Sequence, residues 1–147
     1  MEVKTVGLAC DHAGYALKKF VIQYLEEHGY PYKDYGTYSD QSVDYPDFAH
    51  ALAEGVESGE VYPGIAVCGS GEGMTMTLNK HQGLRAGLAW SIEIAHMIRQ
   101  HNDANVLVMP GRFIDNNTAS AIMDEFFKTT FEGGRHARRI ENMPIRK

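Results

Sequence analysis

The sequence predicts an α/β fold, because short apolar runs rich in β-branched residues alternate five times with longer segments of helical periodicity. This alternation is typical of a parallel sheet whose strands are joined by right-handed helical crossovers. The length of 147 residues suits one domain with a full hydrophobic core. We therefore expect residues 1–147 to form a single-domain, Rossmann-like three-layer sandwich with a five-stranded parallel sheet and a C-terminal helical arm.

The amino-terminal part of the chain predicts two strand–helix units. The first strand is Val3–Ala9, and the helix after it ends near Gly29, because glycine suits the position after a helix end. The second strand is Tyr32–Tyr35, and the polar loop Gly36–Pro46 leads to a helix that ends near Gly59. The buried faces of these two helices are expected to hold Leu17, Phe20, Val21, Tyr24, Leu25, Phe48, Leu52 and Val56.

The rest of the chain continues the alternation. The remaining strands are predicted at Ile65–Val67, Arg85–Ala89 and Asn105–Met109. The helices between and after them are predicted at Met74–Asn79, from the cap residue Ser91 to about His101, and after the cap residues Asp115–Asn117. The last of these helices is expected to bury Ala119, Ile122, Met123, Phe126 and Phe127. Gly133 and Gly134 then shape a turn before the final helical arm.

The composition favours a cytoplasmic protein and argues against several classes of function. The formal net charge of −5 argues against general nucleic-acid binding. No stretch has the length and apolar character expected of a membrane span or of a secretory leader. Cys10 and Cys68 are the only cysteines and form no C-x-x-C pair, which argues against a disulfide scaffold or a cysteine zinc site.

The most informative stretch follows the third predicted strand, where Cys68 precedes three alternating glycines, Gly69, Gly71 and Gly73. Glycines let the backbone approach a ligand closely, and the start of the next helix directs free N–H groups toward it. The stretch therefore predicts an anion-binding loop with a nucleophile or base beside it. The alternative interpretation is a tight turn with an inert buried cysteine.

Three familiar kinds of anion-binding loop do not fit these residues. A P-loop closes with Gly-Lys-Ser/Thr, whereas Gly73 is followed by Met74 and Thr75. A dinucleotide-binding loop has G-x-G-x-x-G spacing, whereas the spacing here is G-x-G-x-G. A cysteine phosphatase loop would have an arginine near the position that Met74 occupies.

Polar residues follow three of the predicted strands, and the carboxyl ends of parallel strands share one end of the sheet. These residues are Asp11 and His12 after the first strand, Cys68 and Ser70 after the third, and Arg112 after the fifth. We expect the loops that carry them to converge on one crevice.

Arginines and histidines are the remaining candidates for ligand binding. Arg112, Arg135 and Arg139 are candidate phosphate ligands, because the planar guanidinium group donates hydrogen bonds in pairs. For the two arginines near the C-terminus, a solvated basic tail is the alternative. His96 and His101 are five residues apart and do not share a helix face, so we expect no metal site.

Five motifs, in this order along the chain, resemble those of the type B ribose-5-phosphate isomerases. The motifs are Cys10–Gly14, Asp44–Pro46, Cys68–Gly71, Arg99–Asp103 and Gly133–His136. The resemblance covers essentially the whole chain, and the last two motifs favour the ribose-phosphate branch of the family. The wider family also contains allose-6-phosphate and galactose-6-phosphate isomerases.

The resemblance implies an enzyme that interconverts ribose 5-phosphate and ribulose 5-phosphate through a cis-enediolate, without metal or cofactor. Cys68 would be the base that moves a proton between the two carbons. Ser70 and the backbone of Gly69–Gly73 would hold the enediolate oxygens. Asp11 and His101 would assist ring opening, with His101 as the proton donor.

The resemblance also implies how the small-molecule sugar phosphate is held. The residues implied to bind the phosphate group are His12, Arg112, Arg135 and Arg139. Tyr45 and Asn102 would contact the sugar. Sites in this family lie between subunits, so a homodimer or homotetramer is implied.

Glu72 departs from the family pattern, which commonly has a small apolar residue at this position in the substrate-binding loop. Family members without the cysteine use a glutamate as base, but that glutamate aligns with Met74 here. A carboxylate facing the enediolate would repel it by roughly 4 kcal/mol at about 4 Å and an effective dielectric constant of about 20. We therefore expect Glu72 to point away from the reacting carbons, with Cys68 as the base.

Three other functions remain open: an allose- or galactose-phosphate isomerase, a non-catalytic sugar-phosphate-binding regulator, and a cysteine-nucleophile hydrolase. The presence of both Cys68 and His101 disfavours the regulator, because binding alone requires neither. The hydrolase is disfavoured because no histidine–acid pair is identifiable that would orient its nucleophile.

Overall fold

The computed structural model describes residues 1–146, so Lys147, the last residue of the expected domain, lies outside the described part of the chain. The strands are β1 (Val6–Cys10), β2 (Tyr32–Asp34), β3 (Gly64–Cys68), β4 (Ala86–Leu88) and β5 (Val106–Pro110). They form one parallel sheet in the order β2-β1-β3-β5-β4. The five-stranded parallel sheet that the sequence predicts is confirmed.

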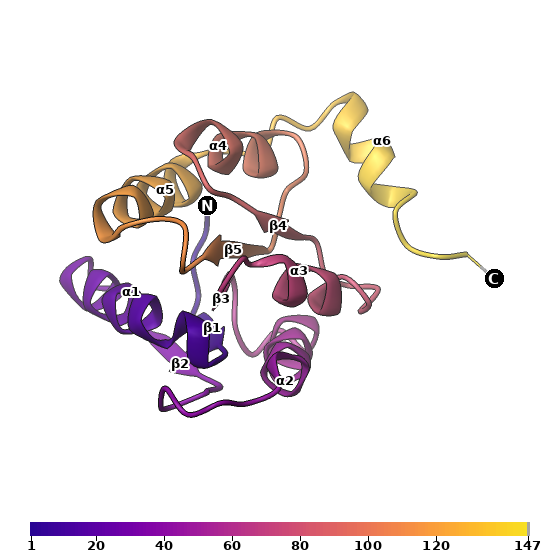
Figure 1. The fold of residues 1–147 in the computed structure, drawn as a ribbon. Helices are drawn as coiled ribbons and strands as arrows, with labels where there is room; N and C mark the ends of the chain where they lie inside the picture. The colour runs from indigo at the N-terminus through magenta and orange to yellow at the C-terminus, as the bar shows by residue number, and fades with distance from the viewer. Residues whose placement is uncertain (147) are drawn as a thin grey trace.

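The helices enclose this sheet on both sides. They are the short 3₁₀ helix η1 (His12–Gly14), α1 (Tyr15–Glu27), α2 (Tyr45–Glu57), α3 (Glu72–Leu78), α4 (Ile92–Gln100), α5 (Asn116–Lys128) and α6 (Arg135–Glu141). Helices α1, α4 and α5 cover one face of the sheet, and α2 and α3 cover the other (Figure 1). The result is the predicted three-layer arrangement, from which α6 projects as a C-terminal helical arm (Figure 1).

Alternation along the strands divides the core into two parts. In β3, Ile65 and Val67 pack beneath α1, α4 and α5, whereas Ala66 and Cys68 pack beneath α2 and α3. Every residue of β1, β3 and β5 is buried, as is typical of a parallel sheet covered on both faces. This pattern explains why these strands appear in the sequence as continuous apolar runs.

Most of the predicted helix faces are buried as expected, including the whole apolar face of α5. The exceptions are only partly buried at the margin of the core and are Phe20, Phe48 and Val56. In α2 the fully buried positions belong largely to small residues, Ala49 and Ala53 among them. Small side chains allow this helix to lie close to the sheet, so its bulkier residues reach only the periphery.

Three predicted element starts differ from the structure by two residues or more. Helix α2 begins at Tyr45, inside the loop predicted over 36–46, because proline at one of its first two positions suits a helix start. Helix α3 begins at Glu72, which is earlier than predicted, directly after a glycine with positive φ. Strand β1 begins at Val6 rather than Val3, because pairing with β2 starts only there.

Helix α1 buries a lysine that the hydrophobic pattern does not indicate. Lys18 is 1% exposed, and its Nζ donates hydrogen bonds to Asp34 Oδ1 at 2.7 Å and to the carbonyl oxygen of Thr37. These contacts join α1 to the end of β2 and to the loop that follows it. The buried ammonium group is thus paired and hydrogen-bonded, which its burial requires.

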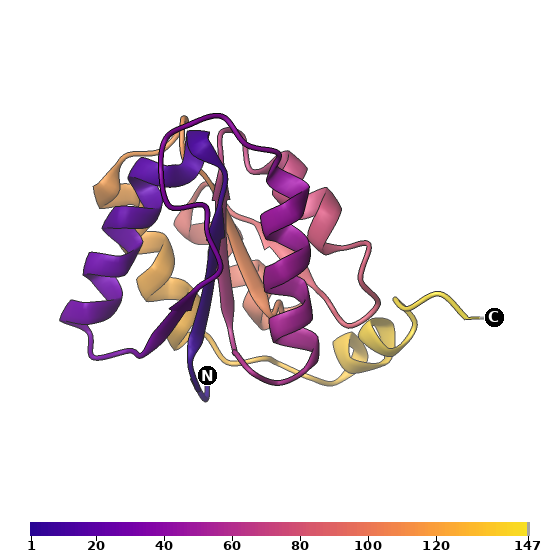
Figure 2. The same ribbon diagram turned by 90° about the horizontal axis from the view of Figure 1, so that it is seen from below.

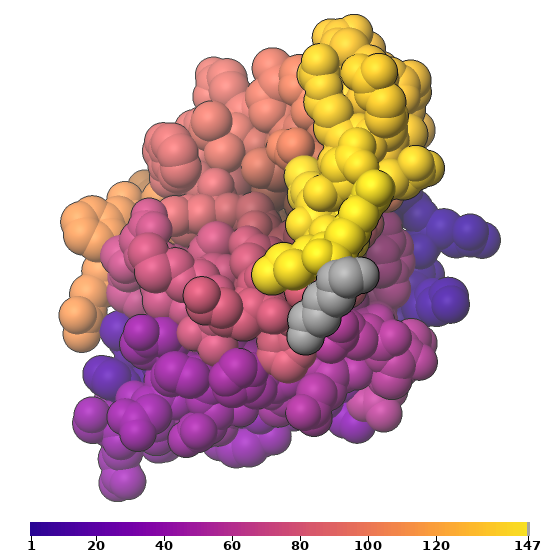
Figure 3. Space-filling model, turned by 90° about the vertical axis from the view of Figure 1, so that its right-hand side faces the viewer, coloured from indigo at the N-terminus to yellow at the C-terminus, as the bar shows by residue number. Residues whose placement is uncertain are grey.

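The two ends of the sheet carry different parts of the chain (Figure 2). We call the end at which the strands start the amino end, and the end at which they stop the carboxyl end. The N-terminus and α6 lie near the amino end (Figure 2). After α6 the chain lies against the loop that follows α3, where the N–H of Ile145 donates to Gln82 Oε1 at 2.9 Å (Figure 3). Within residues 1–146, no helix combines the length and hydropathy that crossing a membrane requires.

Replacing Lys18 should destabilise the fold. The Lys18→Met change removes the ammonium donor that the Asp34 carboxylate and the Thr37 carbonyl share, so we expect the free energy of unfolding to fall by roughly 1–3 kcal/mol. The neighbouring Lys19 is exposed and provides the control, and Lys19→Met should change stability by no more than about 0.5 kcal/mol. Urea unfolding measures both. Equal midpoints for the two variants would show that the buried ammonium contributes nothing.

Candidate active site

Cys68 ends β3 at the carboxyl end of the sheet and is 4% exposed. Its backbone oxygen accepts a hydrogen bond from the N–H of Gly111 at 2.8 Å, which ties it to the segment after β5. The alternation of β3 directs its side chain toward α2 and α3. The sulfur is therefore held in a fixed position at the start of the glycine loop.

Close packing dictates the shape of this glycine loop. Gly71 has a φ of 82°, and a Cβ there would lie 2.4 Å from Leu88 Cδ1. A Cβ at Gly73 would lie 2.6 Å from the ring of Tyr45. Larger residues are therefore disfavoured at both positions. The loop that results turns backbone N–H groups toward the Cys68 sulfur.

Opposing effects act on the pKa of Cys68. Burial is the largest and raises the pKa above its ordinary value. The N–H groups of Met74, Gly71 and Gly73 lower it, whereas the nearby Asp11 carboxylate raises it further. Burial prevails, so the pKa of the Cys68 thiol lies above its ordinary value in the resting chain. The N–H groups are in place to stabilise negative charge once it develops.

Asp11 and His12 reach the same end of the sheet from the turn between β1 and α1. Asp11 is buried, and its Oδ1 accepts a hydrogen bond from the N–H of Gly14 at 3.0 Å. His12 Nδ1 accepts from the N–H of Val43 at 3.2 Å, which leaves Nε2 to carry the ring proton. A Cβ at Gly14 would lie 2.3 Å from the carbonyl oxygen of Val67, so this turn packs directly on β3.

The segment after β5 completes this group. The N–H of Arg112 donates to the carbonyl oxygen of Gly69 at 3.0 Å, and a Cβ at Gly69 would lie 3.4 Å from Arg112 Cδ. Ser70 Oγ accepts from the N–H of Glu72 at 3.2 Å, and both residues are exposed. The predicted site residues gathered at the carboxyl end are Asp11, His12, Tyr45, Cys68, Gly69, Ser70, Gly71, Glu72, Gly73 and Arg112.

The other predicted site residues lie at the opposite, amino end of the sheet and are His101, Asn102, Arg135 and Arg139. The N–H of Gly64, which begins β3, donates to the carbonyl oxygen of Asn105 at 2.9 Å. The segment after His101 is therefore beside the start of β3, whereas Cys68 is at its end. Four steps along a strand span roughly 13 Å. A single chain thus does not place His101 beside Cys68.

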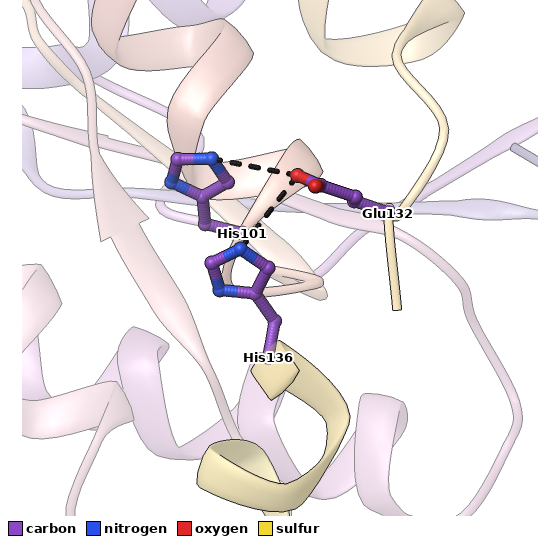
Figure 4. A group of neighbouring side chains, drawn as sticks. All are labelled: His101, Glu132 and His136. Carbon is purple, nitrogen blue, oxygen red and sulfur yellow. Dashed lines mark ion pairs between the residues drawn. The ribbon is translucent and has the colours of Figure 1, made fainter. Parts of the chain in front are cut away.

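His101 belongs to a cluster with two residues that the sequence analysis did not identify as neighbours. Its ring stacks on that of His136 with centroids 4.3 Å apart. Glu132 Oε2 lies 3.7 Å from His101 Nε2 and 3.6 Å from His136 Nε2 (Figure 4). Burial lowers the pKa of His136 below its ordinary value. The sequence feature that could have indicated this cluster is the four-residue spacing of Glu132 and His136 around the Gly133–Gly134 turn.

A cavity of about 310 Å³ lies between α6 and the body of the molecule, away from Cys68. Its walls come from the segment after α3, from β4 and from α6, with Arg85 and Ile140 among the lining residues. Asn102 is the one predicted site residue that lines it. The cavity is therefore separate from the surroundings of the Cys68 thiol.

The fold and the carboxyl-end residues together define a class of protein. A parallel α/β sheet ends in an N–H-lined loop beside a cysteine, with His12 and Arg112 close by, so it suits an anionic substrate and acid–base chemistry by a thiol. The chain belongs to the Ribose/Galactose Isomerase family, which it matches over residues 6–143.

Similar proteins cover nearly the whole chain. Ribose-5-phosphate isomerase B of Escherichia coli K12 is 39% identical, over 95% of this chain and 93% of that protein. The crystal structure of a ribose 5-phosphate isomerase from Thermotoga maritima matches with a TM-score of 0.95 and 43% identity, over 98% of this chain and 99% of that one. Ribose-5-phosphate isomerase B from Mycoplasma genitalium, solved with bound ribulose-5-phosphate, matches with a TM-score of 0.89 and 40% identity, over 95% and 93% of the two chains.

Iodoacetamide should modify Cys68 before Cys10. Cys10 is fully buried, and burial raises its pKa to about 11, whereas Cys68 is 4% exposed beside N–H groups that stabilise a thiolate. Because burial also raises the pKa of Cys68, its modification should still accelerate as the pH rises past the ordinary thiol value of 9.0. Peptide mass spectrometry over a pH series measures both sites, and a sugar phosphate should protect Cys68. Faster labelling of Cys10 would contradict this assignment.

Proposed function

We propose that this protein is an aldose–ketose isomerase that interconverts ribose 5-phosphate and ribulose 5-phosphate through a cis-enediolate. Family membership and the named relatives support the reaction class, and the ribulose-5-phosphate complex of the Mycoplasma genitalium relative supports the substrate. The observation that carries the proposal is the buried Cys68 thiol facing backbone N–H groups at the carboxyl end of the sheet. Such a thiol needs to stay reduced, so we place the protein in the cytoplasm.

The chemistry follows from the position of the thiol. Cys68, once deprotonated, takes the proton from C2 of the open-chain aldose, and the electron pair moves to the C1 oxygen to form the enediolate. The protonated sulfur then returns its proton to C1 while the hydroxyl proton on the C2 oxygen passes to the adjacent C1 oxygen, which yields the ketose. Ser70 and the Gly69–Gly73 backbone hold the enediolate oxygens, and one such donor is worth about 3–4 kcal/mol in comparable oxyanion sites.

A second copy of the chain supplies the remaining residues of the site. Ring opening requires His101 near Asp11, and phosphate binding requires Arg135 and Arg139 near His12, yet one chain holds these groups at opposite ends of its sheet. An isologous dimer solves this problem, because each copy presents its amino-end residues to the carboxyl end of the other. We propose a homodimer, or a homotetramer built from such dimers, with two complete sites in each dimer.

Exposed apolar residues support an interface at the carboxyl end. Phe113 directly follows Arg112 and is 75% exposed, and Trp90, just after β4, is 54% exposed. Tyr45, which packs against the glycine loop, is 39% exposed. Large aromatic side chains are enriched in the cores of protein interfaces. A partner at this face would cover them and exclude water from the sulfur.

The activity and its base are tested with one set of variants. The purified protein should convert ribose 5-phosphate faster than allose 6-phosphate or galactose 6-phosphate. Cys68→Ala should lower kcat by roughly 10²–10⁴-fold, because it removes the base. Glu72→Gln is the matched change within the loop and should keep most of the turnover, because the Glu72 side chain is exposed. An active Cys68→Ala protein together with an inactive Glu72→Gln protein would assign the base to Glu72 instead.

The shared site is tested by mixing two inactive variants. Cys68→Ala removes the base from one end of the chain, and His101→Asn removes the ring-opening acid from the other. Mixed dimers contain one site with neither change, so random exchange should restore roughly a quarter of the wild-type activity. Cys68→Ala mixed with Asp11→Asn is the control. Both changes lie at the carboxyl end, so every site in the mixed dimer carries one of them and no activity should return. Native mass spectrometry verifies that subunits exchange between the two variants. Exchange without recovered activity would refute the shared site.

A further inference from the structure

Three side chains that commonly bind transition metals meet at the amino end of the sheet. His101 follows α4, Glu132 precedes the Gly133–Gly134 turn, and His136 lies in the first turn of α6 (Figure 4). One ligand atom from each of the three side chains lies within 4.8 Å of the others. The N–H of Glu132 donates to the carbonyl oxygen of Gln100 at 2.9 Å, which holds the carboxylate-bearing segment beside His101.

His136 supplies an independent indication of a missing ligand. Its side chain is 9% exposed, and its Nε2 is buried without a hydrogen-bond partner. This nitrogen points toward Glu132, but the 3.6 Å separation is too long for a hydrogen bond (Figure 4). Buried polar atoms are nearly always paired, so an orphaned nitrogen aimed at a carboxylate calls for an atom between them.

We propose that His101, Glu132 and His136 form a binding site for a divalent transition metal of the zinc type. Two imidazoles and one carboxylate, with a fourth position open to water, are a ligand set that zinc accepts. Magnesium and calcium prefer all-oxygen sites and fit poorly.

Two of the three separations between ligand atoms are close to those of tetrahedral zinc. Metal–ligand bonds of about 2.1 Å place tetrahedral ligand atoms about 3.4 Å apart. The two histidine–carboxylate separations, 3.7 and 3.6 Å, therefore need to shorten by only a few tenths of an ångström. The stacked rings must also turn so that their nitrogens converge. The His101 side chain is 35% exposed and has room to make this movement.

Zinc at this site would inhibit isomerisation, a consequence that rests on the proposed function. Coordination occupies the Nε2 lone pair of His101, so this nitrogen can no longer carry and deliver the proton for ring opening. Arg135 and Arg139 lie on the same helix as His136 and oppose a bound cation, whereas the Glu132 carboxylate favours it. The site is thus suited to reversible occupation by free metal rather than to permanent retention.

Calorimetric titration of zinc into the metal-stripped, tag-free full-length protein tests the binding without reference to activity. We expect one zinc per chain, with the affinity lowered by at least about tenfold in Glu132→Gln and in His136→Asn. The matched control is His81→Asn, because His50 Nδ1 and His81 Nε2 lie 2.7 Å apart as a second, exposed histidine pair. That variant should bind zinc as the wild type does. Circular dichroism confirms that each variant is folded.

Unchanged affinity in both cluster variants, or loss of binding in His81→Asn, would overturn the proposed metal site. The inhibition has a separate readout in the isomerase assay. Zinc should lower the wild-type rate, and a chelator should restore it. The same zinc concentration should lower the rate of Glu132→Gln by a smaller fraction than that of the wild type. Binding without inhibition would refute the effect on His101 while leaving the site itself intact. An inactive protein that still binds zinc would refute the proposed function alone.

Discussion

The parallel direction of the strands is the constraint on which the whole arrangement depends. Because β1, β3 and β5 all run the same way, the residues that follow them meet at one end of the sheet, and Asp11, Cys68 and Arg112 become neighbours. The same constraint sends each crossover helix back to the other end. Helix α4 runs back in this way, so His101 at its end lies at the amino end of the sheet, far from Cys68. The proposed function therefore requires a site that is shared between chains.

Several elements could be predicted because a local signal decides them. The Ile65–Val67 run is buried on both faces, Ser91 and Asp115 cap their helices through side-chain oxygens, and Gly29 takes a positive φ after α1. Each outcome depends on a few neighbouring residues. The family motifs suggested the candidate site residues for a related reason, since each motif is a short run of neighbouring residues that can be read without knowing the fold.

Other features could not be predicted because they depend on contacts between distant segments. Lys18 can be buried only because the fold places Asp34 and the Thr37 carbonyl within hydrogen-bond distance of its ammonium group. Phe20 sits at the core margin because of the way α1 packs on the sheet, which helical periodicity does not specify. The meeting of His101 with Glu132 and His136 requires the path of the chain between α5 and α6, and composition carries no information about that path.

The two cysteines lie almost side by side on neighbouring strands, since Cys10 pairs in register with Val67, the residue before Cys68. Their side chains nevertheless enter opposite faces of the sheet. A disulfide requires Cβ vectors that point toward each other, so these two thiols have no route to an internal bridge. An oxidant that converts Cys68 to a sulfenic acid therefore finds no resolving cysteine within the chain. Recovery of the thiol depends on small thiols from solution, and without them oxidation continues toward the irreversible sulfinic and sulfonic acids.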